Sequence, residues 1–419
     1  MVLSTILSKK TIKPSSATPA SLRRHNLSFS DHMATPAYAP MAVLYSKPSE
    51  NNVSQILENS LSKVLVFYYP LAGKLIMDDK CSYVECNDIG AEFLNVRVSC
   101  PMSEILNHAT DIVYPHDLPW RTLSSFNERS LLVVQLSHFD CGGISISVCI
   151  SHKIVDAYSI SMFLNDWAAI TRESDFKPSP QFDANSFFPL MDDPPIYVVP
   201  DFLRGQHQPC VSRMYHFSSS SLGRLKDTVS TNSEVQNPTR FEVAIALIHK
   251  CGREASKANN SGLFKPSLSC HLMNLRPPLP LNTIGNGVHF FNTIAVTEDE
   301  IQVPHFVAQI RKAKQHLRDQ LASRSLMEIK LEPEGANIME REYDFYLCAS
   351  LCRLGLYKAD FGWGSPTRVT PPKNPMKNNL TFLDDPNGDG INALVTLTEA
   401  DMSIFQSNKE LLEFAVPLV

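Results

Sequence analysis

The chain has 419 residues, well above the commonest size of a single domain, and this length predicts two packed domains. Hydrophobic residues make up 43% of the sequence and charged residues 19%, a balance that excludes a disordered chain and indicates a globular protein. The 38 basic and 43 acidic residues leave a formal net charge of -5, so no basic field would attract nucleic acid.

The cysteines and the apolar stretches indicate the compartment. The ten cysteines include no CxxC pair, which favours reduced thiols packed as small apolar residues over a disulfide framework or a zinc site. No apolar stretch has the pattern of a signal peptide or the length of a membrane span. The sequence therefore predicts a cytoplasmic protein with no membrane attachment.

The first half of the chain alternates between helical and strand-like patterns. Apolar residues at helical spacing across residues 53–65 predict an amphipathic helix, which Pro70 and Gly73 close before a short strand. Residues 131–135 read as a buried strand, and residues 144–151 alternate strictly, with their isoleucines and valine on one face. A helix is then expected to begin at residue 156 or 157.

The second half starts again after a proline-rich break over residues 177–209, where we place the domain boundary. Thr239 and Glu242 form a capping-box pattern that opens a helix, and a second helix is expected over residues 305–321. Strands expected around His271, Phe290 and Leu394 complete an α/β pattern.

His152 and Asp156 stand where the alternating strand gives way to a helix. By strand parity the imidazole of His152 points into the protein, and such a ring can take a proton at neutral pH and return it in the same turnover. The alternative is a core histidine satisfied by one hydrogen bond, with Asp156 as an ordinary helix N-cap. The residues alone leave both interpretations open.

Two further motifs read as turns. The sequence of residues 359–366 (ADFGWGSP) predicts a tight buried turn. These residues are not the DFG motif of a protein kinase, because the chain lacks the glycine-rich and HRD loops of a kinase. Residues 385–390 (DPNGDG) match part of a calcium loop, but Thr396 occupies the position of the essential glutamate. A β-hairpin turn is therefore expected there, and no metal site.

Taken together, residues 152–156 (HKIVD) and 360–364 (DFGWG) resemble the two signature motifs of the plant BAHD acyltransferases. Further matches run nearly from end to end, among them residues 69–74 (YPLAGK), 139–143 (FDCGG) and 274–276 (NLR). The pattern is similar to the branch that acylates specialised metabolites, including acylsugar, alkaloid and capsaicinoid acyltransferases.

The resemblance implies an α/β fold of two chloramphenicol-acetyltransferase-like domains joined by a long crossover loop, with a channel between them. We expect an N-terminal domain over residues 1–180 that carries HxxxD and a proline-rich linker over residues 181–210. A C-terminal domain over residues 211–419 then carries DFGWG.

The resemblance also assigns roles to individual residues. His152 becomes the catalytic general base, and Asp156 becomes a structural residue paired with Arg276, because a buried carboxylate needs such a partner. Asp360 and Trp363 are implied to be framework residues that support the site and the binding of coenzyme A.

The implied reaction uses acyl-CoA as co-substrate and no bound cofactor. The base removes the proton of an acceptor hydroxyl, the oxygen attacks the thioester without a covalent enzyme intermediate, and the departing thiolate receives the proton. Thr239 and Arg240 are expected to favour the phosphates of coenzyme A at a helix N-terminus, with an ordinary capped helix as the alternative.

The acceptor is expected to be a hydroxyl of a bulky specialised metabolite, either an acylsugar such as a sucrose ester or an alkaloid. Met41 and Val43, in an aliphatic segment, are expected to line its pocket, with a core strand as the alternative. Two other functions stay open, an N-acyltransferase acting on an amine and a catalytically silent member that binds a metabolite. The expected partners are acyl-CoA and a small acceptor, and the expected state is a monomer.

Overall fold

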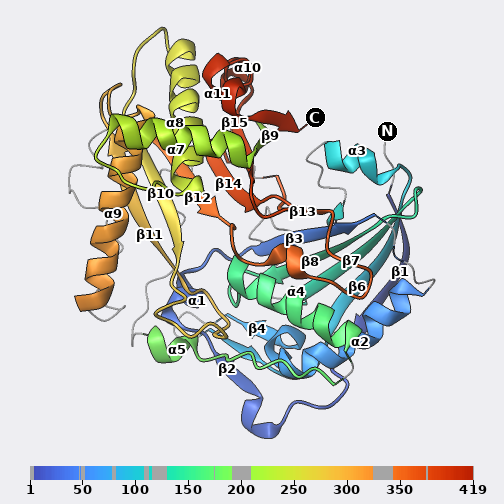
Figure 1. Ribbon diagram of the computed structural model, residues 1–419. Helices are drawn as coiled ribbons and strands as arrows, with labels where there is room; N and C mark the ends of the chain where they lie inside the picture. The colour runs from blue at the N-terminus through green and yellow to red at the C-terminus, as the bar shows by residue number, and fades with distance from the viewer. Residues whose placement is uncertain are drawn as a thin grey trace. The chain divides into compact units, whose positions relative to one another are not determined.

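The computed structural model describes residues 4–46, 48, 52–77, 82–107, 113–115, 130–173, 175–190, 209–323, 343–373 and 376–418. Its contacts divide the chain into two compact units, each with its own sheet and helices, which confirms the predicted α/β fold class (Figure 1). The first unit comprises Met1–Val198, Asn274–Val288 and Leu354–Pro372. The second comprises Val199–Met273, His289–Arg353 and Lys373–Val419.

The strands of the first unit are β1 Ser4–Ile12, β2 Arg24–Asn26, β3 Tyr38–Tyr45, β4 Lys74–Ile76, β5 Tyr83–Glu85, β6 Ala91–Val98, β7 Leu132–Phe139, β8 Ile144–Ser151 and β13 Arg368–Thr370. Its α-helices are α1 Phe29–Met33, α2 Val53–Phe67, α3 Met102–Asn107, α4 Ala157–Arg172 and α5 Ala184–Phe187. Short 3-10 turns are η1 Ala20–Leu22, η2 Tyr69–Ala72 and η7 Leu356–Lys358.

The main sheet of the first unit has the strand order β1-β6-β7-β8-β3-β13. β6 and β7 pair in parallel, whereas β8 pairs antiparallel with both β7 and β3. α2 and α4 pack against each other and lie along one face of this sheet (Figure 1). Every residue of β8 is buried, so both faces of this central strand are covered, although its alternating sequence predicted a single apolar face.

The strands of the second unit are β9 Cys210–Phe217, β10 Ser267–Asn274, β11 Val288–Ala295, β12 Asp344–Ser350, β14 Asn379–Asp384, β15 Ile391–Thr398 and β16 Val416–Leu418. Its helices are α7 Ser219–Asn232, α8 Arg240–Asn259, α9 Val303–Ser323, α10 Glu399–Phe405 and α11 Lys409–Phe414.

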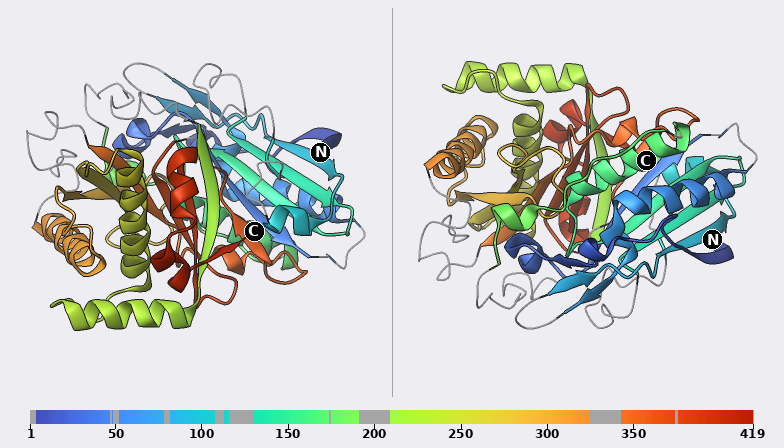
Figure 2. Two further views of the ribbon diagram at one scale, coloured as in Figure 1. Left: turned by 90° about the horizontal axis from the view of Figure 1, so that it is seen from above. Right: turned by 90° about the horizontal axis from the view of Figure 1, so that it is seen from below.

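The sheet of the second unit has the order β11-β10-β12-β14-β15-β9-β16, and α8 and α10 pack against β15 within it (Figure 2). α8 is central because it packs against α7, α9 and α10, and residues 243–248 are all buried. Apolar side chains from these helices and from β14 and β15 form the core of the unit.

The elements expected from the sequence are present in both units. α2, α4 and α9 match the predicted helices, and the capping box of Thr239 and Glu242 opens α8. β14 and β15 form an antiparallel hairpin, and Asp385 Oδ1 accepts a hydrogen bond from Gly390 N at 3.1 Å within its turn. Within the described residues, no three His, Cys, Asp or Glu side chains gather as metal ligands.

We expected one domain to end at residue 180 and the other to begin at residue 211, but each unit is made of several separate chain segments. Asn274–Val288 and Leu354–Pro372 belong to the first unit, although both come late in the sequence. The second of these segments carries β13, which pairs with β3, so DFGWG lies in the first unit and not in the C-terminal domain. Local sequence patterns cannot show such long-range strand pairing. Residues 191–208 of the expected linker lie outside the described residues.

None of the helices in the described parts of the chain combines the length and the apolar character needed to cross a bilayer.

Candidate active site

His152 occupies the turn that connects β8 to α4. β8 ends at Ser151, and the backbone N–H of His152 donates to the carbonyl of Ala37 at 2.8 Å. Asp156 caps α4 by accepting a hydrogen bond from Ser159 N at 2.8 Å. Because the strand stops before His152, this turn directs the imidazole, and the parity argument from the sequence does not apply. The ring is half-buried.

The expected ion pair between Asp156 and Arg276 is present. Nη1 of Arg276 lies 2.8 Å from Oδ2 of Asp156, and the side chains are 0% and 2% exposed. The same carboxylate oxygen accepts from the backbone N–H of Gly287 at 2.9 Å. Both oxygens of Asp156 are therefore engaged within the first unit, one at the helix cap and one at the ion pair.

Arg276 binds backbone groups of its own segment, Asn274–Val288. Its guanidinium donates to the carbonyls of Gly285, at 2.9 Å, and Thr283, at 3.0 Å. A Cβ added at Gly287 would lie 2.6 Å from Arg276 Nη1, so only glycine allows the guanidinium this close. The pair therefore ties Asn274–Val288 to the start of α4.

Asn286, which the sequence analysis missed, binds the ring of His152 directly. Its Oδ1 lies 3.0 Å from His152 Nδ1, and its Nδ2 donates to the carbonyl of His152 at 2.8 Å. Nε2 of His152 makes no hydrogen bond to any described residue. One ring nitrogen is thus held by the protein, and the other is available for a substrate.

Asp31, also missed from the sequence, holds Asn286 in turn. Its Oδ1 accepts from both the backbone N and the Nδ2 of Asn286, each at 2.8 Å. Asp31 is 1% exposed and forms a capping box with Ser28 at the start of α1. The S-x-x-D pattern of residues 28–31 was the available signal for the cap. No local pattern indicated the contact with Asn286.

Two basic residues lie near Asp31. Lys153 is 2% exposed and donates from Nζ to the carbonyl of His32 at 2.6 Å. Burial lowers the pKa of Lys153 to about 8, and the charge of Asp31 offsets part of this effect. Burial also lowers the pKa of His25, again opposed by Asp31.

Residues 360–364 form a turn at the far end of α4 from His152. Oδ1 of Asp360 accepts from the backbone N–H groups of Gly362, at 2.8 Å, and Gly364, at 2.9 Å, whose φ angles of +110° and +92° suit glycine. Arg172, the last residue of α4, donates to the carbonyl of Asp360.

The aromatic residues of this turn pack into the first unit. The ring of Phe361 lies 5.1 Å from that of Trp167, and Trp363 stacks on Phe361 at 5.7 Å. Trp167, on which Phe361 packs, lies 11 residues after Asp156, about 16 Å along α4 at 1.5 Å per residue. Asp360 and Trp363 are therefore not brought together with His152.

Thr239 and Arg240, in the second unit, are occupied by protein contacts. Thr239 caps α8, and Oε2 of Glu242 accepts a hydrogen bond from the backbone N–H of Thr239 at 2.8 Å. Arg240 donates to the carbonyl of Gly388 at 2.5 Å and lies 3.4 Å from the carboxylate of Asp384. A carboxylate already stands at this helix N-terminus, so the structure favours the alternative, an ordinary capped helix.

Met41 and Val43 lie in β3, between β8 and β13. Their side chains are 3% and 0% exposed. Their position favours the alternative that this segment is a core strand, because both are covered by the chain itself.

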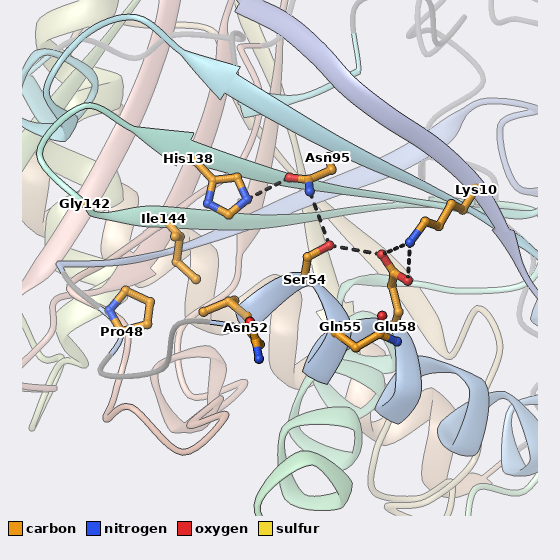
Figure 3. Close-up of a pocket in the computed structure, with 11 residues that line it drawn as sticks. Lys10, Pro48, Asn52, Ser54, Gln55, Glu58, Asn95, His138, Gly142 and Ile144 are labelled. Atoms are coloured by element: carbon orange, nitrogen blue, oxygen red, sulfur yellow. Dashed lines mark hydrogen bonds and ion pairs between the residues drawn. The ribbon is translucent and has the colours of Figure 1, made fainter.

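A polar cavity of about 470 Å³ lies beside the N-terminal end of α2 (Figure 3). Hydrogen bonds and an ion pair along its wall join the side chains of Lys10, Glu58, Ser54, Asn95 and His138. The cavity reaches Ile144 at the start of β8, whereas His152 follows the end of that strand. The 8 residues of β8 span about 26 Å, so the cavity is separate from the histidine site.

The arrangement around His152 suits proton transfer, since a fixed imidazole presents one nitrogen to a reacting group. Solved structures and known sequences indicate the chemistry. The structure of vinorine synthase is similar to this chain with a TM-score of 0.79 and 28% identity, covering 98% of both chains.

Two relatives are similar along their whole length. Acylsugar acyltransferase 3 of Solanum lycopersicum is 54% identical, with 100% of this chain and 99% of the relative covered. The 17,18-epoxy-17-hydroxycur-19-ene N-malonyltransferase of Strychnos nux-vomica is 41% identical, with 98% of this chain and 90% of the relative covered.

The family model described as "Transferase family" matches residues 3–412. This match covers both units and both signature motifs. The chain therefore belongs to the BAHD acyltransferases of the transferase family and is an enzyme that uses acyl-CoA as its acyl donor.

Proposed function

We propose that the protein is an O-acyltransferase that moves an acyl group from acyl-CoA to a hydroxyl of a partly acylated sugar, with His152 as the general base. The similarity to acylsugar acyltransferase 3, at 54% identity over the full chain, supports the acceptor class. The observation that carries the mechanism is the His152 ring, whose Nδ1 is bound to Asn286 and whose Nε2 makes no bond to any described residue.

The proposed reaction needs one proton relay. Nε2 of His152 takes the proton of the acceptor hydroxyl while the oxygen attacks the thioester carbonyl. The tetrahedral intermediate collapses, the carbon–sulfur bond breaks, and the coenzyme A thiolate receives the proton from the ring. Because a thioester is already activated, no covalent enzyme intermediate is required.

The remaining site residues act as support in this proposal. Asp156 and Arg276 hold the turn that carries His152, because their oxygens and nitrogens are engaged with each other and with backbone groups. Asp360 and Trp363 fix the segment that follows η7 against α4. The contacts of Thr239, Arg240, Met41 and Val43 support structural roles for them.

The test of the mechanism compares His152→Ala and His152→Gln with the parent enzyme. We expect turnover to fall about 10²- to 10⁴-fold in both variants, as is typical when a positioned base is lost. The thermal melt should stay close to that of the parent. A His152→Ala enzyme with parent turnover would refute the base.

The test of the acceptor uses three hydroxyl compounds with one acyl-CoA. We expect a sucrose ester to give a higher kcat/KM than a hydroxylated alkaloid or shikimate. A preference for the alkaloid would move the assignment to that class, and a preference for shikimate would refute a bulky acceptor. No acyl transfer to any acceptor would favour a catalytically silent member of the family.

A second candidate is amide formation. It is favoured by one relative, at 41% identity, that is named an N-malonyltransferase. An amine acceptor tested beside the sucrose ester separates the two reactions, since each product has a different mass and the ester is cleaved by mild base.

We also propose that the enzyme is a cytoplasmic monomer. The described cysteines form no disulfide with one another, which supports a reducing compartment. Localisation of a fluorescent fusion tests the compartment. Light scattering after gel filtration should give a mass near 46.8 kDa.

A further inference from the structure

The side-chain amide of Asn286 lies between three groups. Its Nδ2 faces Asp31 Oδ1 and the carbonyl of His152, each at 2.8 Å, and its Oδ1 faces His152 Nδ1 at 3.0 Å. The two amide hydrogens on Nδ2 therefore meet two oxygens that can only accept. Asn286 uses both of its donors and one acceptor in this cluster.

These partners allow only one orientation of the amide. If the amide turned over, its oxygen would face both the carboxylate of Asp31 and a carbonyl, and a buried group would lose two hydrogen bonds. With Oδ1 toward the ring, Nδ1 of His152 must be the donor, because an amide oxygen cannot donate. In a neutral imidazole the lone pair then lies on Nε2, the nitrogen that a base must present.

Asp31 is itself fixed by separate contacts of its two oxygens. Oδ2 accepts from the backbone N of Ser28 at 3.1 Å and from its Oγ at 2.6 Å. Among the described residues, Oδ1 accepts only from Asn286, through the backbone N and Nδ2. One oxygen thus caps α1, and the other is aimed at the amide that binds His152.

We propose that Asp31 is a positioning residue, which sets the orientation of the Asn286 amide and so holds His152 with its hydrogen on Nδ1 and its lone pair on Nε2. This inference rests on the proposed function, in which Nε2 of His152 is the base. Asp31 does not reach the reacting atoms and acts through Asn286 alone.

Other charged groups also face this cluster. Lys153 and His25 interact with Asp31, and the carboxylate of Asp156, which pairs with Arg276, accepts from the backbone N–H of Gly287, next to Asn286. Each variant below therefore keeps these four residues unchanged, so that differences in pH dependence arise from Asp31 and Asn286.

The first experiment replaces Asp31 with asparagine, which keeps the shape of the side chain and allows the Asn286 amide to turn over. We expect kcat to fall about 10- to 100-fold, as for other groups that orient a functional histidine. The KM for acyl-CoA should stay within about twofold, because Asp31 does not contact that substrate in the proposed reaction.

Asp88→Asn is the matched control in the same unit. The Asp88 carboxylate also holds a backbone N–H and a hydroxyl, those of Thr18, at 3.0 and 2.6 Å. It has no contact with Asn286 or His152 among its hydrogen bonds. This variant should lose stability and keep the kcat of the parent.

The second experiment exchanges the two residues in the double variant Asp31→Asn/Asn286→Asp. The new aspartate accepts from His152 Nδ1 and so keeps the hydrogen on that nitrogen, although the hydrogen bond from residue 286 to the carbonyl of His152 is lost. We expect kcat to recover about tenfold relative to Asp31→Asn, and the acid limb of the pH profile to move up by about one unit, because a carboxylate now faces the imidazole.

A third measurement needs no variant at Asp31. The ¹⁵N shifts of the histidine rings in the parent protein, with His152 assigned by its absence in His152→Gln, report which nitrogen carries the hydrogen. We expect the Nδ1–H form. The Nε2–H form would overturn the inference even if Asp31→Asn fails to fold.

The outcomes separate this inference from the proposed function. Parent activity in His152→Ala refutes the base itself. An inactive His152→Ala with parent kcat and pH profile in Asp31→Asn refutes only the role of Asp31, as does a double variant no faster than Asp31→Asn.

Discussion

The carboxylate of Asp156 has two structural contacts close to His152, the proposed general base. Oδ1 caps α4 through Ser159, and Oδ2 pairs with Arg276 in a place that solvent does not reach. Neither oxygen remains for proton transfer, and His152 stands four residues earlier with a nitrogen that no described residue binds. These hydrogen bonds support our proposal that, within HxxxD, His152 is the base and Asp156 is a structural residue.

Asp156→Asn tests this division. Asparagine is also a good N-cap, so the helix start is retained, while one partner of a buried ion pair is lost. We expect the free energy of unfolding, measured by urea denaturation, to fall by about 3 to 5 kcal/mol.

The matched control is Glu413→Gln, which removes the partner of Arg224 from an exposed pair with 55% and 58% exposed side chains. Its effect should be below about 1 kcal/mol. An Asp156→Asn protein that unfolds like the parent but has lost turnover would give the aspartate a chemical role instead.

At the scale of residues, the sequence reached some members of the site and not others. Asp156 as an N-cap followed from the boundary between strand and helix, because capping is a local effect. Arg276 followed only from the resemblance to the family. Asn286 and Asp31 are 255 positions apart in the sequence, and no local pattern indicates the hydrogen bonds between them.

At the scale of elements, α4 connects the histidine turn to the DFGWG turn. Its N-cap, Asp156, belongs to the site, and its last residue, Arg172, binds the backbone of Asp360. Phe361 packs on Trp167 within the same helix. We therefore propose that the DFGWG motif supports the site by holding α4 in place, and not by contact with His152.

Asp360→Ala tests this role of the motif. The variant loses two hydrogen bonds to turn amides, which costs about 1 to 3 kcal/mol. We expect the melting temperature to fall while kcat at saturating substrates stays within about twofold of the parent, since the reacting atoms are untouched. A fall in kcat without a loss of stability would place Asp360 in the chemistry.

The elements themselves were largely predictable because helices, caps and hairpins depend on near neighbours. α2, α4, α9 and the hairpin around residues 385–390 follow from apolar spacing and turn residues. The covered second face of β8 was not predictable, because its buried serines look like solvent-facing residues in the sequence.

At the scale of the whole molecule, two α/β units could be predicted from length, composition and resemblance, but their chain segments could not. The pairing of β13 with β3 joins residues 368–370 to residues 42–44. Through this pairing, a segment from late in the sequence becomes part of the first unit. The single boundary that we expected within residues 181–210 therefore corresponds only to the first of several places where the chain passes from one unit to the other.

The pH dependence of folding is a further property of the molecule, and two buried histidines of the second unit contribute to it. His271 stacks on Phe291 with ring centroids 4.9 Å apart, and burial lowers its pKa to about 3. Burial likewise lowers the pKa of His249, with smaller contributions from the charges of Arg253 and His271. Both rings are therefore neutral in the folded protein at neutral pH.

Acid should destabilise the protein through these rings. An unfolded histidine titrates near pH 6.5, so between about pH 6.5 and pH 3 the unfolded chain binds a proton that folded His271 does not. The stability is complete above this window and is lost as the pH falls through it. Between about pH 7 and pH 5 one such histidine lowers the free energy of unfolding by about 2 kcal/mol.

We therefore expect urea denaturation to show a smaller loss of unfolding free energy over this interval in His271→Gln, whose amide can still bind Thr293, than in the parent. Equal losses in the parent and His271→Gln would contradict the assignment.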